Sequence, residues 1–188
     1  YGYFNCGRSD NSLILYNEDC SKSVGKFIFP RQKSGKKLCI SDFYNNIENN
    51  QPTDIIPMQA VTMGSKASLF AQELFEGDNY SDYLYFHGLA VQMAEALAEL
   101  IHSRIRIECG FKIQEPNDIT NILSQKYQGC RFSFGYPACP NVSDSSLQLR
   151  LLKTDKIGLT IDSSDQLHPE QSTTALVALH SQARHFSA

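Results

Sequence analysis

One short segment gathers most of the residue types that could hold a ligand. Residues 127–140 have the sequence Tyr-Gln-Gly-Cys-Arg-Phe-Ser-Phe-Gly-Tyr-Pro-Ala-Cys-Pro, whose glycines and prolines impose an irregular backbone. Arg131 offers a planar fork of donors that matches a carboxylate. We expect a strand over Phe132–Phe134 that ends at Gly135 and presents these rings, with Tyr136, as flat apolar surface. The segment suits a zwitterion carrying an aromatic base, or a packed loop with Arg131 in an internal salt bridge; the residues alone favour the loop.

Other candidate groups carry less chemistry. Cys139 could act as a nucleophile, but its flanking prolines indicate a structural turn, and no paired histidine is identifiable. Glu99 and His102 lie three residues apart on one predicted helix face, with His87 further along. Metal binding needs three or four converging ligands, so we expect solvated polar groups there. Residues 162–165 (Asp-Ser-Ser-Asp) predict a turn, because the alternating acidic pattern of a calcium loop is absent.

Composition excludes several classes of protein. The chain has 188 residues, of which 41% are apolar, which is enough for one domain with a sizeable core. Its 17 basic and 20 acidic residues give a net charge of -3, without the basic stripe of a nucleic-acid-binding protein or a membrane-surface cluster. No apolar run reaches the ~18–20 residues that span a bilayer.

The cysteines and the N-terminus indicate a reducing compartment. Residues 1–6 lack the basic and apolar segments of a signal peptide, and the absence of a starting Met is expected of a fragment or processed chain. We therefore predict a cytoplasmic protein whose six cysteines are free thiols. No Cys-x-x-Cys pair occurs, which disfavours a structural zinc site.

Strands and helices must position the central segment. We predict strands over residues 2–5, 12–16 and 26–29 as a meander, a loop over 45–53, and strands over 54–63 and 173–180. We predict helices over 66–75 with Ser65 as N-cap, over 80–107 as one long element, from Pro116-Asn117-Asp118 to about 127, and over 145–152 capped by Asp144 or Ser143. Because the strands do not alternate with the helices, the pattern predicts an α+β fold with a twisted antiparallel sheet.

The central segment resembles the signature of a known family. The string Arg131-x-x-x-Gly135-Tyr136-Pro137-Ala138-Cys139-Pro140 is similar to that of the C-terminal activation domain of cobalamin-dependent methionine synthase. Residues 29–32 (Phe-Pro-Arg-Gln), the long helix around residues 87–99 and residues 168–175 also resemble family segments. The resemblance covers essentially the whole chain, taken as one domain over residues 1–188.

The resemblance implies a function and a set of site residues. Family members bind S-adenosylmethionine and support reductive methylation of cob(II)alamin, which regenerates methylcobalamin in methionine biosynthesis. The implied partners are a cobalamin-binding domain of the same methyltransferase and a flavodoxin-type electron donor. Arg131 would hold the methionine carboxylate, and Glu95 would contact the ammonium group or the cobalamin interface. The implied S-adenosylmethionine-binding residues are Arg131, Phe132, Ser133, Gly135, Tyr136, Glu95, His185 and Phe186.

Three departures from the family pattern keep an alternative open. His185-Phe186 stands where the family has Tyr-Tyr or Tyr-Phe, and Gln125 stands where several members have Glu. A preceding Asp-Trp segment, whose Asp contacts the ligand in the family, has no counterpart here, so we expect a domain shortened at its N-terminus. The alternative is a non-catalytic interaction module that docks on a cobalamin domain without binding the ligand.

Overall fold

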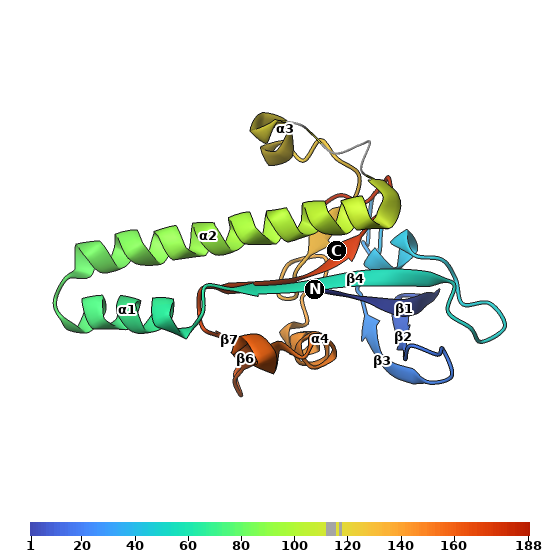
Figure 1. Ribbon diagram of the computed structural model, residues 1–188. Coiled ribbons are helices and arrows are strands. Elements are labelled where there is room, and N and C mark those ends of the chain that lie inside the picture. The colour runs from blue at the N-terminus through green and yellow to red at the C-terminus, as the bar shows by residue number, and fades with distance from the viewer. Residues whose placement is uncertain (112–115, 117) are drawn as a thin grey trace.

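An antiparallel sheet packed against helices confirms the predicted α+β fold (Figure 1). The computed structural model describes residues 1–111, 116 and 118–188. Within these residues, a six-stranded sheet has the order β3-β2-β1-β4-β8-β5, and every neighbouring pair is antiparallel. Its strands are β1 (Gly2–Ser9), β2 (Ser12–Tyr16), β3 (Ser23–Ile28), β4 (Asp54–Thr62), β5 (Cys130–Phe132) and β8 (Ser172–Ala178); β6 (Thr160–Ile161) and β7 (Leu167–His168) form a separate hairpin.

The predicted strands are confirmed, with shifted ends. The first three form the expected meander, and the 45–53 segment is a loop. The strand expected over 132–134 instead spans 130–132, where Arg131 pairs with Val177 of β8. It stops at Phe132 because the next residues form a tight turn in which the Gly135 N–H donates to the Cys139 carbonyl at 2.9 Å.

The helices cover both faces of the sheet. They are α1 (Ser65–Glu76), α2 (Tyr80–Arg106), α3 (Ile119–Leu123) and α4 (Ser145–Leu152), with 3-10 turns at Ile40–Phe43, Val142–Asp144 and Thr154–Ile157 and a π-helical turn at Ile107–Phe111. Figure 1 shows α2 on one side of the sheet and α4 on the other, with α1 folded back along the far half of α2. None of the helices among the described residues combines the length and apolar character that crossing a bilayer requires.

Two expectations about the helix ends were wrong, and one predicted cap was confirmed in position. Gly64, at φ 82°, is the N-cap of α1, and Ser65 is its first residue. Helix α3 ends at Leu123 rather than near 127, because Gln125 takes a left-handed conformation (φ 52°). Its Asp118 N-cap accepts from the Asn121 N–H, while Asn117 lies outside the described residues. Asp144 occupies the N-cap position of α4 but makes no side-chain cap bond.

Small residues let the long helix approach the sheet closely. Ala90, Ala94 and Ala98 recur every four residues on α2 and are buried. Because the side chains at these three positions are only methyl groups, the helix backbone comes close enough to bond a side chain of β4. The Gln59 amide of β4 donates to the Ala98 carbonyl at 3.0 Å. This contact fixes where the last turns of α2 stand relative to the sheet.

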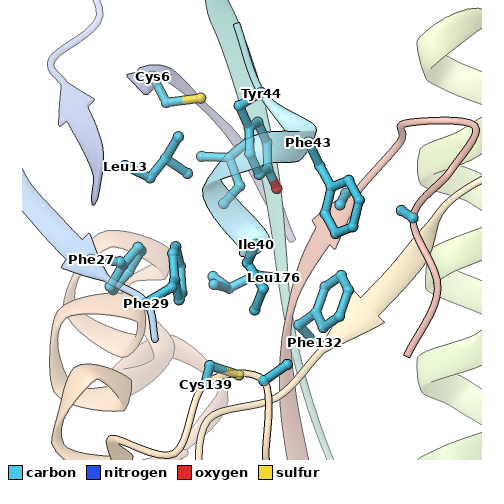
Figure 2. Packing of buried hydrophobic residues seen from close by; sticks show 14 of the residues in the cluster. Cys6, Leu13, Phe27, Phe29, Ile40, Phe43, Tyr44, Phe132, Cys139 and Leu176 are labelled. Carbon is cyan, nitrogen blue, oxygen red and sulfur yellow. The ribbon is translucent and has the colours of Figure 1, made fainter. Parts of the chain in front are cut away.

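The main core lies at the β1–β2–β3 end of the sheet and reaches to β5 (Figure 2). Phe27 and Phe29 from the meander, Ile40 and Phe43 from the 3-10 turn, and Phe132 from β5 are all buried there. Figure 2 shows Phe43 and Phe132 facing one another, and their rings stack with centroids 6.0 Å apart. The core therefore anchors one side of β5, while the other side of that strand remains a sheet edge.

Gly129 gives a test of how tightly β5 is held. It has φ 99°, and an added Cβ would lie 2.9 Å from the Ala178 carbonyl oxygen. We expect Gly129→Ala to destabilise the chain by about 2 kcal/mol, from backbone strain and this clash. Gly88→Ala, on α2 where nothing lies within 4 Å of an added Cβ, should stabilise it by about 0.5–1 kcal/mol. Urea denaturation measures both, and equal shifts for the two variants would contradict the prediction.

Candidate ligand-binding cleft

A cleft of about 570 Å³ opens beside β5. Its walls come from β5 and the loop after it, from the C-terminal tail, and from α2. All the residues predicted from the family resemblance except Gly135 contribute to its lining. The lining residues are Glu95, Gln125, Tyr127, Gly129, Cys130, Arg131, Phe132, Ser133, Tyr136, Pro137, Ala138, Thr173, His185, Phe186 and Ser187.

Arg131 forms internal ion pairs and also lines the cleft. Its Nη2 lies 3.7 Å from Oε2 of Glu95 and 3.5 Å from Oε2 of Glu99, so it does form internal ion pairs. Its side chain also stays 22% exposed and lines the cleft. Because both distances exceed those of a good N–H···O hydrogen bond, the guanidinium retains donors for a further carboxylate.

The loop after β5 shapes the mouth of the cleft. Gly135 has φ 91°, which a residue with a side chain rarely adopts, and this allows the turn that bonds to Cys139. The Cys139 thiol donates to the Ser133 carbonyl from the inside of the turn. Tyr136 is left 67% exposed at the rim, where its ring is available to a ligand. Gly135 therefore shapes the cleft by setting the course of the backbone, although it does not line the cleft itself.

The aromatic residues divide between the cleft and the core. Phe132 is 2% exposed, and its ring packs edge-on against Phe186 and His185 of the C-terminal tail, at 6.0 and 5.8 Å. These contacts hold the tail against the cleft. Phe134, which we expected to supply ligand surface, is buried against Phe27 at 5.1 Å and is not among the lining residues.

The cleft environment keeps His185 uncharged. Partial burial, and then the positive charge of Arg131, lower the pKa of His185 below its ordinary value. At neutral pH the ring is therefore the neutral imidazole, which can accept or donate a hydrogen bond without adding positive charge to the cleft.

A polar group that the sequence analysis misjudged lies behind the cleft. Glu99 and His102 were expected to be solvated, but His102 is fully buried and Glu99 is largely buried. The Tyr127 hydroxyl donates to Glu99 at 3.0 Å, and the buried Arg106 guanidinium stacks 3.6 Å above the Tyr127 ring. The 4-3-4 spacing of Glu95, Glu99, His102 and Arg106 was the available signal, since it places all four on one helix face next to the alanine stripe.

Burial explains the state of His102. It lowers the pKa of His102 to about 2, with further lowering by the charges of Arg106 and Arg131. The imidazole is therefore neutral throughout the physiological range. Among the described residues, neither of its ring nitrogens has a hydrogen-bond partner, and its ring stands edge-on to Tyr127 at 5.3 Å.

The cysteine considered as a nucleophile, Cys139, is a buried thiol. All six cysteines are free thiols, as predicted. Burial raises the pKa of Cys139 to about 12, which disfavours the thiolate that a nucleophile requires.

Across the described residues, no group of three or more His, Cys, Asp or Glu side chains is arranged to hold a metal ion. The predicted turn at 162–165 is confirmed, with Asp162 accepting from the Ser164 and Gln166 N–H groups.

Comparison with known proteins assigns the family. The antiparallel sheet, the long helix and a cleft lined by an arginine, a carboxylate and aromatic rings define an α+β domain with a candidate ligand cleft among the described residues. The family described as "Vitamin B12 dependent methionine synthase, activation domain" matches residues 1–188. The chain belongs to this family, as its resemblance implied.

Relatives and a solved structure agree with this assignment. Methionine synthases of Mycobacterium leprae and Mycobacterium tuberculosis are each 40% identical to all of this chain, which spans 16% and 17% of their respective lengths. The crystal structure of the MetH reactivation domain bound to AdoHcy superposes with a TM-score of 0.90 at 24% identity. That likeness covers 99% of this chain and 59% of the other, and it shows that the two share a fold.

His102 predicts how stability depends on pH. The unfolded chain takes up a proton on this residue below about pH 6.5, whereas the folded chain does so only near pH 2. Stability should therefore fall as pH drops below 6.5, with this residue contributing up to about 1.4 kcal/mol per pH unit. We expect the unfolding free energy of His102→Leu, measured by urea denaturation, to depend less steeply on pH below 6.5, by the equivalent of about one proton. The variant should lose no stability at pH 7. An unchanged slope would contradict this assignment.

Cys139 predicts a pattern of alkylation. With its pKa near 12, about one molecule in 10,000 carries the thiolate at pH 8. Iodoacetamide should therefore modify the partly exposed Cys20 well before Cys139 in the folded chain, as followed by peptide mass spectrometry. All six thiols should react in guanidinium chloride. Early modification of Cys139 under native conditions would show that the thiol is activated.

Proposed function

We propose that this chain binds S-adenosylmethionine in the cleft beside β5 and supports reductive methylation of cob(II)alamin within a methionine synthase. The observation that carries the proposal is the convergence of seven of the eight residues implied by the family resemblance on one cleft. The neighbour with the same fold is described as bound to AdoHcy, the product left when S-adenosylmethionine loses its methyl group.

Arg131 and Glu95 suit the amino-acid end of this ligand. The Arg131 guanidinium would pair with the ligand carboxylate in a bidentate arrangement, which is the strongest form of this interaction. Glu95, whose side chain is 51% exposed in the cleft wall, would then meet the ammonium group. The ligand carboxylate and ammonium would thus replace the Arg131–Glu95 ion pair with two new pairs, so neither side chain is left without a counter-charge.

The rest of the cleft suits the adenosine and the sulfonium. Backbone groups of Phe132, Ser133, Gly135 and Tyr136 would bond the nucleoside, and the Tyr136 and Phe186 rings would offer apolar faces. A sulfonium cation is favoured near carboxylates and π faces. The neutral state of His185 supports this, because a charged imidazole in the lining would repel the cation. Gln125, also in the lining, contributes no charge.

The chemistry itself belongs to groups outside this chain. Cobalamin, carried by a neighbouring domain, would supply the cobalt that accepts the sulfonium methyl once an electron from a flavodoxin-type donor has reduced it. The contribution of this chain would be positional, since it would hold the methyl donor in a fixed orientation. The complete enzyme would be the cytoplasmic 5-methyltetrahydrofolate–homocysteine methyltransferase, of which the chain covers about a sixth.

Loss of the Arg131 guanidinium should weaken ligand binding. We expect Arg131→Ala to raise the Kd for S-adenosylmethionine tenfold or more, because a lost charged hydrogen-bonded pair costs about 1.5–3 kcal/mol. Isothermal titration calorimetry measures this directly. Arg150→Ala, on the exposed face of α4, is the matched control and should leave the Kd unchanged.

The same titration separates the two functions considered from the sequence. If the intact chain shows no binding, and Arg131→Ala has no effect on reactivation in a full-length parent enzyme, the proposal fails. Retained docking to a cobalamin domain in a pull-down, with thermal stability indifferent to S-adenosylmethionine, would then identify the chain as an interaction module.

A further inference from the structure

Glu99 lies at the junction of three side chains that shape the cleft. Its Oε2 accepts from the Tyr127 hydroxyl at 3.0 Å and lies 3.5 Å from Nη2 of Arg131. Its Oε1 lies 3.4 Å from Nη2 of Arg106. One carboxylate therefore contacts a buried guanidinium, a partly exposed guanidinium and a tyrosine that lines the cleft.

Glu99 differs from Glu95 in its access to a ligand. Glu95 lines the cleft and its side chain is 51% exposed, whereas Glu99 is 22% exposed and is not a lining residue. Both lie one helical turn apart on α2 and both face Arg131. The outer carboxylate can exchange its partner for a ligand group, while the inner one is also held by Arg106, which is buried and does not line the cleft.

Glu99 lies between two positively charged side chains. Arg106 is fully buried, and its charge and that of Arg131 converge on the same carboxylate. His102, which packs against the same tyrosine, is neutral and therefore adds no third positive charge to this group. Without Glu99, Arg131 would lose its inner contact and would keep only the exposed Glu95 as a carboxylate partner among the described residues.

We infer that Glu99, itself held by the Tyr127 hydroxyl, is a positioning residue that orients Arg131 to receive the carboxylate of the ligand, without touching the ligand itself. This inference rests on the proposed function. The carboxylate of an incoming amino acid would displace Glu95 from Arg131 and leave the Glu99 contact in place. Glu99 thereby makes the cleft selective for adenosyl ligands that keep their α-carboxylate.

Glu99→Gln tests this inference with two ligands. We measure Kd for S-adenosylmethionine and for decarboxylated S-adenosylmethionine by calorimetry on the 188-residue chain. The variant should bind S-adenosylmethionine about fivefold more weakly and change the Kd of the decarboxylated ligand less than about twofold. In an Arg131→Ala background the effect on S-adenosylmethionine should also fall below about twofold, because the two residues act as one unit. Glu73→Gln, an exposed carboxylate on α1, is the control.

The outcomes separate this inference from the proposed function. If the wild-type chain binds neither ligand, the proposed function fails and the inference fails with it. If the wild type binds S-adenosylmethionine and Glu99→Gln binds both ligands unchanged, or loses both equally, only the role of Glu99 is overturned. Should Glu99→Gln fail to fold, Tyr127→Phe removes the hydroxyl that donates to Glu99, and a loss confined to the carboxylate-bearing ligand supports the inference; an equal loss, or none, overturns it.

Discussion

The close approach of α2 to the sheet governs how the cleft is built. Alanines at every fourth position bring the helix backbone near enough for a β4 glutamine to bond the Ala98 carbonyl. That spacing places the adjacent face of the helix, which carries Glu95, Glu99 and Arg106, directly behind β5 and the residues that precede it. A bulkier residue in the alanine stripe would move the charged groups and the strand apart, and the cleft wall would lose its continuity.

The buried charge in the cleft wall is stabilised by neighbouring side chains. A fully buried arginine is costly to desolvate, and here a carboxylate and the face of Tyr127 stabilise it together. The neighbouring histidine avoids the same penalty by staying neutral. The only charged groups left partly open to the cleft lining are Arg131 and Glu95, as far as the described residues extend. These two opposite charges lie 3.7 Å apart, so the charged part of the lining is a single spot within the cleft.

The sequence predicted the elements well and the buried charges poorly. Strand and helix patterns located the meander, β4, the long helix and α4 because their apolar periodicity is strong. The family motif located the cleft. The end of β5 was misplaced because a tight turn, stabilised by bonds to Cys139, replaces the strand after Phe132. Glu99 and His102 were taken as solvated because helical spacing identifies a shared face without showing what covers it; Tyr127, far along the chain, is what covers them.

The two margins of the sheet have a consequence for behaviour in concentrated solution. At one margin β5 has only three residues, too few to template pairing with a strand from another molecule. At the other margin β3 carries an outward lysine, Lys26, and its register with β2 shifts at Leu15/Tyr16, so it too is a poor surface for strand addition. The fold can thus place the cleft beside an edge strand while resisting edge-to-edge aggregation.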